Sequence, residues 1–344
     1  MADPIPMRKS PDPEPSARRL AGLTAWTLTE GHAGMEIQAR ALAEALGLDP
    51  VVKRAAAPKA TGWLPPRLWP SALANANKRG ADLTPPWPDV LITCGRRVVA
   101  PALAIRRASR EGGAPGTFAI HIQNPRVPLR LFDVVVAPDH DAITGPNVVS
   151  CLGSIHPLTA RRLTAEGLAS RKRFADLPRP LVTVLVGGAN RAYGIGTKEM
   201  ERLADSIFSL MVRQNCGVAV VPSRRTGRRN VRLLKDRLSD IGAYVWDGED
   251  ENPYLALIGL ADALIVTCDS VNMVCEAAAS GKPVYIMMYK GRSVRFDAFH
   301  AAMRTRGHVR AFSGQIDFFW RPAPLLEIDA VATEIVQRYR AARG

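Results

Sequence analysis

Short apolar runs recur along this chain, and most are followed by a segment with the apolar spacing of a helix. Continuous runs of this kind are typical of parallel strands that are covered on both faces. In the first half the predicted strands are Leu23–Leu28, Val51–Val52, Val90–Thr93, Phe118–Ile122 and Val134–Ala137. In the second half they are Leu181–Val186, Val218–Val221, Ala243–Trp246, Ala263–Val266 and Val284–Met287. Strands that alternate with helices predict an α/β fold with parallel sheets.

Helices are predicted between these strands from apolar spacing and from the residues at their ends. The expected helices are Met35–Leu46, Ala100–Ser109, one that begins near Thr197, and the last one at about 329–341. The first of them stops at Gly47. Asn252 and Pro253 predict a further helix start, with Asn as the cap and Pro in the first turn.

The strand Ala263–Val266 leads directly into another helix, whose start carries Asp269 and Ser270. Either side chain can accept a hydrogen bond from the free N–H groups of the first turn. Gly281 is the expected C-terminal cap. At 100° per residue, one side of this helix carries Asp269, Asn272, Met273 and Glu276, and the other carries Val271, Val274, Cys275 and Ala278. One face is therefore expected to pack on a sheet, and the opposite face to offer polar groups.

The length of 344 residues exceeds what a single core usually reaches and predicts two domains. Two consecutive βα-rich halves indicate two doubly wound Rossmann-like domains facing a cleft, the GT-B arrangement. The expected domains are 20–178 and 179–328, joined near the Pro-punctuated segment Asp176–Pro180. Residues 329–344 are expected to form a C-terminal helix that is able to pack back on the first domain. Residues 1–19, rich in proline and charge, are predicted to be a disordered tail.

Composition narrows the partners and the location. The net charge of +14 suits a polyanion, either nucleic acid, an anionic membrane surface or a phosphorylated substrate. Only 6% of residues are aromatic, without basic–aromatic interleaving, which makes nucleic acid unlikely. The Pro- and Trp-rich stretch 58–88 is predicted to be irregular; its aromatic side chains either anchor a loop or touch lipid. The oligomeric state is not indicated.

The five cysteines, at 94, 151, 216, 268 and 275, are an odd number without metal-ligand spacing. They are expected to be buried thiols in a reducing compartment. No apolar run reaches the length of a membrane span. These features favour a cytoplasmic protein, which the basic charge could hold peripherally at the inner face of the plasma membrane.

Three loops of the second half follow the carboxyl ends of predicted strands and carry candidate donor-binding residues. The first is rich in small residues and would let backbone amides approach a diphosphate, or is a plain tight turn. The second carries paired guanidiniums that suit phosphate, with a solvated basic helix beyond them from Arg228. In the third, the helix start suits an anion and Glu276 suits ribose hydroxyls; the alternative is a capped helix with a solvated Glu. The candidates are Gly187, Gly188, Asn190, Ser223, Arg224, Arg225, Thr226, Thr267, Asp269, Ser270, Met273 and Glu276.

In the first half, a Gly-rich loop after the first strand carries Glu30 and His32, either of which could act as the general base toward an acceptor hydroxyl. A lone loop histidine can equally be incidental. Residues expected to bind the acceptor or phosphates are Gly31, Gly34, Arg96, Arg97, Gln123 and Arg126. Asp139-His140-Asp141 imitates a metal-binding D-x-D, but that motif is typical of a different, single-domain fold, so no metal is expected.

Several motifs together resemble the bacterial branch of the mitochondrial fission ELM family. They are Glu30-Gly31-His32-Ala33-Gly34, Ile92-Thr93-Cys94-Gly95-Arg96-Arg97, Ile122-Gln123-Asn124-Pro125-Arg126, Ala137-Pro138-Asp139-His140-Asp141, Pro222-Ser223-Arg224-Arg225-Thr226 and Val266 to Glu276. The resemblance covers nearly the whole chain after about residue 20, and departs from the family pattern at Glu30 and Asn124, where Asp is expected. The second half is also similar to the donor half of the peptidoglycan N-acetylglucosaminyltransferase, which implies that Glu276 holds ribose and that Ser270 and Met273 flank the diphosphate or sugar.

These patterns lead to one expected function and two alternatives. The expectation is a metal-independent GT-B glycosyltransferase that uses a nucleotide-diphosphate sugar as substrate, without a cofactor, on a cell-envelope lipid or polysaccharide acceptor. The first alternative, implied by the family resemblance, is a non-catalytic adaptor that recruits a membrane-remodelling partner. The second is a nucleotide-sugar epimerase, although the sequence lacks the Y-x-x-x-K pair and the N-terminal G-x-x-G-x-x-G of dehydrogenase-type epimerases.

Overall fold

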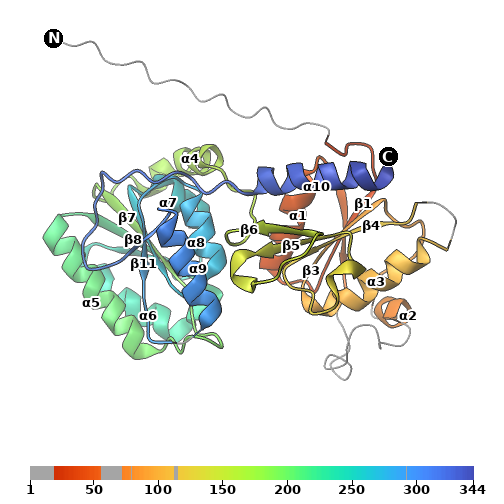
Figure 1. Cartoon of the computed structure of the whole chain (residues 1–344). Coiled ribbons are helices and arrows are strands. Elements are labelled where there is room, and N and C mark those ends of the chain that lie inside the picture. Colours follow the sequence, from red (N-terminus) through yellow and green to blue (C-terminus); the bar gives the residue numbers. More distant parts are fainter. Residues whose placement is uncertain (1–18, 56–71, 79, 112–114, 292) are drawn as a thin grey trace, which may run out of the picture. The chain divides into compact units, whose positions relative to one another are not determined.

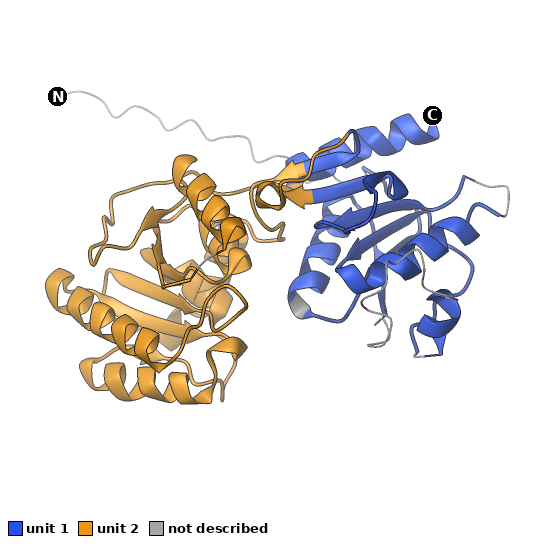
Figure 2. Cartoon of the chain, turned by 60° about the horizontal axis from the view of Figure 1, so that its bottom comes forward, with its two compact units in different colours: residues 1–136, 146–149, 329–344 blue, residues 137–145, 150–328 orange. Residues whose placement is uncertain are grey.

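The chain forms two compact units, each built on one six-stranded sheet (Figures 1 and 2). The computed structural model describes residues 19–55, 72–78, 80–111, 115–291 and 293–344. The first unit comprises 1–136, 146–149 and 329–344, and the second comprises 137–145 and 150–328. The expected link at 176–180 therefore lies inside the second unit, because the chain passes from one unit to the other before it. Most of the predicted tail and the first part of the Pro/Trp stretch lie outside the described residues.

The first unit has the strand order β2-β1-β3-β4-β5-β6. Its strands are β1 (Ala25–Thr29), β2 (Pro50–Arg54), β3 (Val90–Cys94), β4 (Phe118–Ile122), β5 (Val134–Pro138) and β6 (Val148–Cys151). Its helices are α1 (Ala33–Ala45), α2 (Ala72–Asn77), α3 (Val99–Ala108) and α10 (Ile328–Arg343). The last helix packs on this unit, since the Tyr339 ring lies 5.1 Å from that of Phe118.

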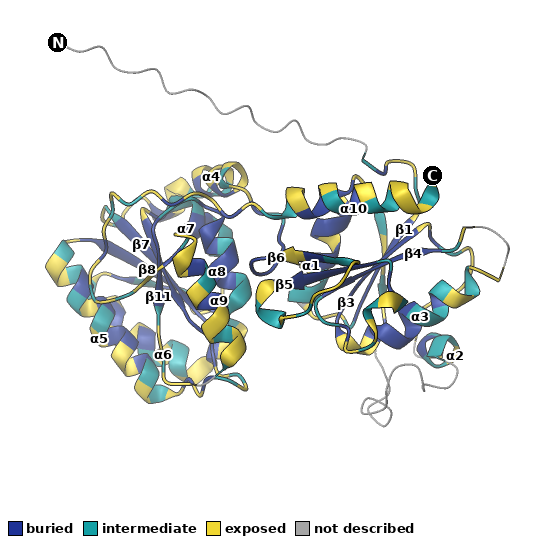
Figure 3. Cartoon of the chain, in the orientation of Figure 1, coloured by how far each residue is buried: buried dark blue, intermediate teal, exposed yellow. Residues whose placement is uncertain are grey.

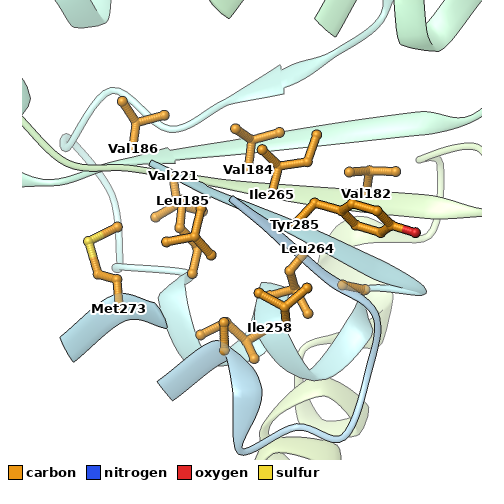
Figure 4. Packing of buried hydrophobic residues seen from close by; sticks show 14 of the residues in the cluster. Val182, Val184, Leu185, Val186, Val221, Ile258, Leu264, Ile265, Met273 and Tyr285 are labelled. Carbon is orange, nitrogen blue, oxygen red and sulfur yellow. The ribbon is translucent and has the colours of Figure 1, made fainter. Parts of the chain in front are cut away.

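The second unit has the strand order β12-β11-β10-β7-β8-β9. Its strands are β7 (Leu181–Val186), β8 (Gly217–Pro222), β9 (Tyr244–Val245), β10 (Ala263–Thr267), β11 (Val284–Met287) and β12 (Arg310–Ala311). Its helices are α4 (Ala160–Ala169), α5 (Thr197–Gln214), α6 (Arg228–Leu238), α7 (Tyr254–Leu260), α8 (Val271–Ala278) and α9 (Val294–Thr305). Side chains from these strands and helices form one apolar core (Figure 4).

Apolar runs become central strands here because both faces of each sheet are covered. β1, β3, β4, β7, β8 and β10 are buried along their whole length, and Figure 3 shows the sheets as the most buried layer. All five cysteines are buried free thiols, as expected. None of the helices in the described part of the chain combines the length and apolar character that a bilayer crossing requires.

The α/β class and the two doubly wound Rossmann-like units are confirmed, and all ten predicted strands are present. The predicted helix start at Asn252-Pro253 is wrong in one detail. Pro253 precedes α7 instead of occupying its first turn, although Asn252 does accept a hydrogen bond from Tyr254 N (3.0 Å). The sequence prediction did not include β6, β12, α4 or α9.

Each sheet reverses its order of winding once. In the first sheet the reversal lies between β1 and β3, and in the second between β7 and β10. All the strand pairs joined there run parallel, so the loops at their carboxyl ends meet at one edge. Ligands of open α/β sheets bind at such an edge, next to the reversal.

Candidate functional site

Three loops at the carboxyl edge of the second sheet are tied together by the carboxylate of Asp269. This side chain is 2% exposed and accepts hydrogen bonds from Gly188 N (2.9 Å) and from Thr267 Oγ1 (2.6 Å). Arg225 Nη2 adds an ion pair at 2.8 Å. The prediction that Asp269 lies on the polar, ligand-facing side of the helix is therefore wrong, because the helix begins only after Ser270 and the carboxylate points into the loops.

The two glycines after β7 are required by close approach to the neighbouring loops. A Cβ atom at Gly187 would lie 2.1 Å from Asp269 Oδ2, and one at Gly188 would lie 2.0 Å from the Arg225 carbonyl oxygen. Gly187 N donates to Thr267 Oγ1 at 2.8 Å, and Gly188 N donates to Asp269. Both amides are thus engaged within the protein, and the expectation that they hold a diphosphate is not met by this geometry.

The polar side chains beside these glycines also hold the loops in place. Asn190 Nδ2 donates to the Asp269 carbonyl oxygen at 3.0 Å, while its Oδ1 accepts from Tyr193 N at 2.9 Å. Thr226 Oγ1 lies 2.5 Å from the Gly187 carbonyl oxygen and is buried. These residues, predicted as donor ligands, act as the framework of the site.

Helix α8 begins at this edge and is capped as predicted. Ser270 Oγ accepts a hydrogen bond from Met273 N at 3.4 Å. The Met273 side chain is buried in the core cluster instead of lying on the polar face (Figure 4). The dipole of α8 favours an anion at this end of the helix, where the first-turn amide of Met273 is already bonded to Ser270.

Glu276 lies in the second turn of α8 and is partly buried. Its Oε2 accepts a hydrogen bond of 2.5 Å from the hydroxyl of Tyr254, the first residue of α7. Burial raises the pKa of Glu276 to about 7, and the Tyr254 hydrogen bond opposes that rise. Burial also raises the pKa of Tyr254 well above its ordinary value, so the phenol stays a donor.

The two predicted phosphate-binding arginines have different environments. Arg225 is committed to the framework, because it donates to the Gly188 carbonyl oxygen (3.0 Å) and pairs with Asp269. Arg224 is exposed and lines a cavity of about 680 Å³ beyond the ends of β8 and β9. The cavity is also lined by Ser223, Gly227, Arg228, Arg232, Lys235, Trp246, Asp247 and Glu249. Residues predicted as a solvated basic helix therefore form a cationic wall.

Two aromatic residues near this edge were not singled out from the sequence. Tyr254 is the partner of Glu276, and Trp246 is part of the cavity lining. The indole Nε1 of Trp246 is buried without a hydrogen-bond partner among the described residues. The signal that could have found them is their position, since each directly follows a strand or starts a helix at the carboxyl edge of the sheet.

The first unit brings its own candidates together at the carboxyl edge of its sheet. Glu30 Oε1 accepts from Arg97 N at 3.1 Å, which joins the loops after β1 and β3. His32 Nε2 lies 3.9 Å from Glu30 Oε2, and the His32 side chain is 70% exposed. Gly31 N donates to Thr29 Oγ1 at 3.1 Å. The histidine is thus free to meet a substrate, whereas Glu30 holds the loop.

The remaining first-unit candidates lie at the same edge. Arg96 is exposed in the single 3₁₀ turn after β3, and Gly34 lies in the first turn of α1. Gln123 follows β4, where its N–H pairs with Val136 of β5, and the exposed Arg126 donates its N–H to Asn124 Oδ1 at 2.8 Å. These residues thus lie in loops at the carboxyl edge of the first sheet, with Arg96 and Arg126 exposed.

Asp139-His140-Asp141 has a structural role in the second unit. Arg306, the C-cap residue of α9, pairs with Asp139 at 3.0 Å, and Arg295 in the first turn of α9 pairs with Asp141. Burial lowers the pKa of His140, whose ring packs against Phe299. Across the residues that the structure describes, no cluster of three His, Cys, Asp or Glu side chains could hold a metal ion.

Comparison with known proteins places this chain in a family. Residues 33–339 match the family described as mitochondrial fission ELM1. The chain belongs to this family. It is 32% identical over 284 residues to the mitochondrial fission protein ELM1 of Arabidopsis thaliana, covering 75% of this chain and 65% of that protein. It is 23% identical over 235 residues to an uncharacterized protein of Rickettsia prowazekii, covering 58% of this chain and 64% of the relative. The match therefore spans just under two thirds of the length of either relative.

The fold of this ELM1-family chain is found in solved structures of GT-B type. A UDP-GlcNAc 2-epimerase of Methanocaldococcus jannaschii, crystallised with UDP-GlcNAc and UDP, superimposes with a TM-score of 0.54 at 14% identity. The similarity covers 93% of this chain and 99% of that enzyme. At this identity the likeness establishes the fold alone, and the function has to be argued from the residues of the site.

Proposed function

We propose that this chain is a metal-independent GT-B glycosyltransferase whose second unit binds a nucleotide-diphosphate sugar. The observation that carries the proposal is the cationic cavity of about 680 Å³ at the carboxyl edge of the second sheet, lined by Arg224, Arg228 and Arg232. A pocket with convergent guanidinium groups suits a phosphorylated ligand. The acceptor would be a cell-envelope lipid or polysaccharide, reached at the cytoplasmic face of the membrane.

The diphosphate would be held by charge rather than by the glycine amides. Arg224 is free of the framework that occupies Arg225, and Arg228 and Arg232 line the same cavity. When the bond to the sugar breaks, negative charge develops on the leaving diphosphate. Guanidinium groups positioned there stabilise that charge, which is the role a metal ion has in other glycosyltransferases.

The nucleoside would lie toward α7 and the loop after β9. Ionised Glu276 can accept hydrogen bonds from ribose hydroxyls, and the Tyr254 hydroxyl keeps the carboxylate oriented (2.5 Å). Because the pKa of Glu276 is about 7, the accepting form is populated mainly above neutral pH. Trp246 lines the cavity and offers part of its apolar ring to a base, while its Nε1 is buried.

Transfer also requires a base for the acceptor hydroxyl, a role we assign to His32. Its ring is exposed and lies 3.9 Å from Glu30, which is anchored to Arg97 N. Glu30 would supply a nearby negative charge and remain outside the reaction. His32→Gln should therefore abolish transfer to an envelope lipid extract while nucleotide binding is retained.

Calorimetry with UDP, GDP and ADP tests the nucleotide site. Arg224→Gln should weaken the best ligand by about tenfold or more, as expected for the loss of one charge-assisted contact. The matched control is Arg202→Gln, an exposed arginine of α5 outside the cavity lining, which should bind like the wild type. Absence of heat for every nucleotide, or equal affinity of Arg224→Gln and wild type, would count against the proposal.

The second candidate is a non-catalytic adaptor, which the 32% identity to a protein named for mitochondrial fission favours. An adaptor would retain its protein partner in a pull-down when Glu276 or Arg224 is replaced by alanine. A third candidate, an epimerase, predicts interconversion of a nucleotide sugar in the absence of any acceptor.

A further inference from the structure

A short turn after β12 presents an aromatic side chain directly to solvent. This turn, residues 317–321 and here called the aromatic turn, contains Phe318, Phe319 and Trp320 in succession. Phe319 is 88% exposed, while its two aromatic neighbours pack against the core of the second unit. Exposing a phenylalanine side chain to water is unfavourable in free energy, so a conformation that holds Phe319 in solvent needs a physical explanation.

The exposed position of Phe319 is determined by the hydrogen bonds that hold the turn. Asp317 N donates to the hydroxyl of Tyr285 at 2.8 Å, and Asp317 Oδ1 accepts from Phe319 N at 3.0 Å. The ring of Trp320 lies edge-on to that of Tyr285, with the centroids 5.9 Å apart. Arg321 Nη1 donates to the carbonyl oxygens of Phe318 (2.5 Å) and Trp320 (3.0 Å). Anchoring the neighbours in this way directs Phe319 outward.

Two arginines lie in or against the turn that carries Phe319. Arg321 is part of the turn, and the guanidinium of Arg310 lies 4.1 Å from the centre of the Trp320 ring. Asp317, the acidic residue of the turn, is paired with Arg310 at 3.3 Å. Because Arg310 and Arg321 outnumber Asp317, the turn that carries Phe319, together with Arg310, has a net positive charge.

The end of α5 extends this surface. Gln214, the last residue of α5, exchanges two hydrogen bonds of 2.8 Å with the backbone of Ile316, immediately before the aromatic turn. In the same final helical turn, Val212 is 68% exposed and Arg213 is exposed. Figure 3 shows the outward, exposed side of α5. A second apolar side chain and another cation thus lie on the element that adjoins the turn.

We propose that the aromatic turn and the end of α5 dock on an anionic lipid bilayer. Phe319 would enter the boundary between headgroups and acyl chains, where aromatic side chains are favoured. Arg213, Arg310 and Arg321 would remain among the headgroups and attract acidic phospholipid. The net charge of +14 adds a long-range attraction to the same surface. This proposal does not depend on nucleotide binding.

Vesicle co-sedimentation without nucleotide tests the proposal, with phosphatidylcholine vesicles that contain or lack phosphatidylglycerol. The full chain should bind only the anionic vesicles strongly, and Phe319→Ser should weaken this binding by about tenfold, the loss expected from one buried aromatic side chain. Leu168→Ser, a matched change of an apolar α4 residue that is 63% exposed, should leave binding unaltered. Because Phe319 makes few contacts, the thermal midpoint of Phe319→Ser should equal that of the wild type.

A second variant locates the ring directly. In Phe319→Trp, the added indole fluorescence should be quenched by brominated lipid in anionic vesicles, beyond the quenching of the wild type. The proposal is overturned if the added indole is not quenched, or if Phe319→Ser and wild type bind vesicles equally. It is likewise overturned if Phe319→Ser abolishes self-association of the chain but leaves vesicle binding intact, because the occupant would then be a second copy.

Discussion

At the residue scale, some charged side chains of the site hold its loops in place and others take no part in that framework. Asp269 and Arg225 neutralise each other and hold the loops, with the carboxylate 2% exposed. Breaking such a pair leaves a buried charge and would be strongly destabilising. Arg224 and Glu276 take no part in that cluster, and we propose both as ligand-binding residues. This division explains why adjacent arginines in the sequence have different roles.

Glu276 carries a prediction about stability and pH. Its folded pKa of about 7 lies above the ordinary value of 4.5 because burial disfavours the charged form. Between pH 4.5 and 7 the folded protein therefore keeps a proton on Glu276 that the unfolded chain releases. The free energy of unfolding is highest below pH 4.5 and falls as the pH rises through 7. The neutral Gln of Glu276→Gln does not titrate. The difference in free energy of unfolding between this variant and the wild type should therefore increase, in favour of the variant, by on the order of 2 kcal/mol from pH 5 to pH 8.

Urea unfolding at pH 5 and pH 8 measures this difference. Glu201→Gln, a change of an exposed carboxyl on α5, serves as the control and should follow the wild type at both pH values. If the stabilities of Glu276→Gln and wild type change in parallel with pH, Glu276 is ionised throughout and the assigned environment is wrong.

Part of the site could be predicted from residue patterns. Ser270 was predicted as a helix cap and is one, because capping depends only on local sequence. The role of Asp269 could not be predicted from helical spacing, which assumed that the residue belongs to the helix. Whether a loop amide is free depends on which side chain from another strand reaches it, and for Gly188 that side chain lies 81 positions away.

At the element scale, close contact between α4 and α7 holds α7 in position. Both helices carry a glycine at the crossing, and a Cβ atom on Gly259 would lie 1.9 Å from the Leu163 carbonyl oxygen. The first residue of α7 is Tyr254, so the position of α7 determines where the partner of Glu276 lies. The sequence analysis did not predict α4, because most residues of this helix are polar or small and its apolar pattern is weak.

Gly259→Ala should therefore destabilise the second unit by more than about 2 kcal/mol, because the added methyl group meets rigid backbone. Chemical denaturation provides the measurement. Gly194→Ala is the matched control, since a Cβ atom there would have no heavy atom within 4 Å. Equal stability of the two variants would mean that α4 and α7 are not in such close contact.

The strands were the elements that sequence predicted best. Leu181–Val186, Phe118–Ile122 and Val284–Met287 agree with the structure at both ends, because burial on both faces demands continuous apolar residues. β12 has only two residues, both exposed, and so leaves no apolar signal. Predictions from apolar runs thus succeed where burial determines composition, whereas the partly or fully exposed edge strands β6 and β12 were missed.

At the scale of the whole molecule, two six-stranded sheets, each with one reversal of winding, make up a chain of the ELM1 family. The number of domains could be predicted from length and from the repeated βα pattern. The boundary between the domains could not be predicted. The main segment of the second unit, Ser150–Ile328, begins before the proline-rich segment that suggested a link. The C-terminal helix packs back on the first unit, as the sequence analysis expected for residues 329–344.

The central claim is that the carboxyl edge of the second sheet binds a nucleoside diphosphate. Hydrogen–deuterium exchange of the full chain, with and without saturating UDP, GDP or ADP, tests it most directly. The account predicts slower exchange for at least one nucleotide in the segments 223–232, 246–254 and 268–276, with the exposed end of α5 unchanged. Unaltered exchange in all three segments, or protection confined to other parts of the chain, would contradict it.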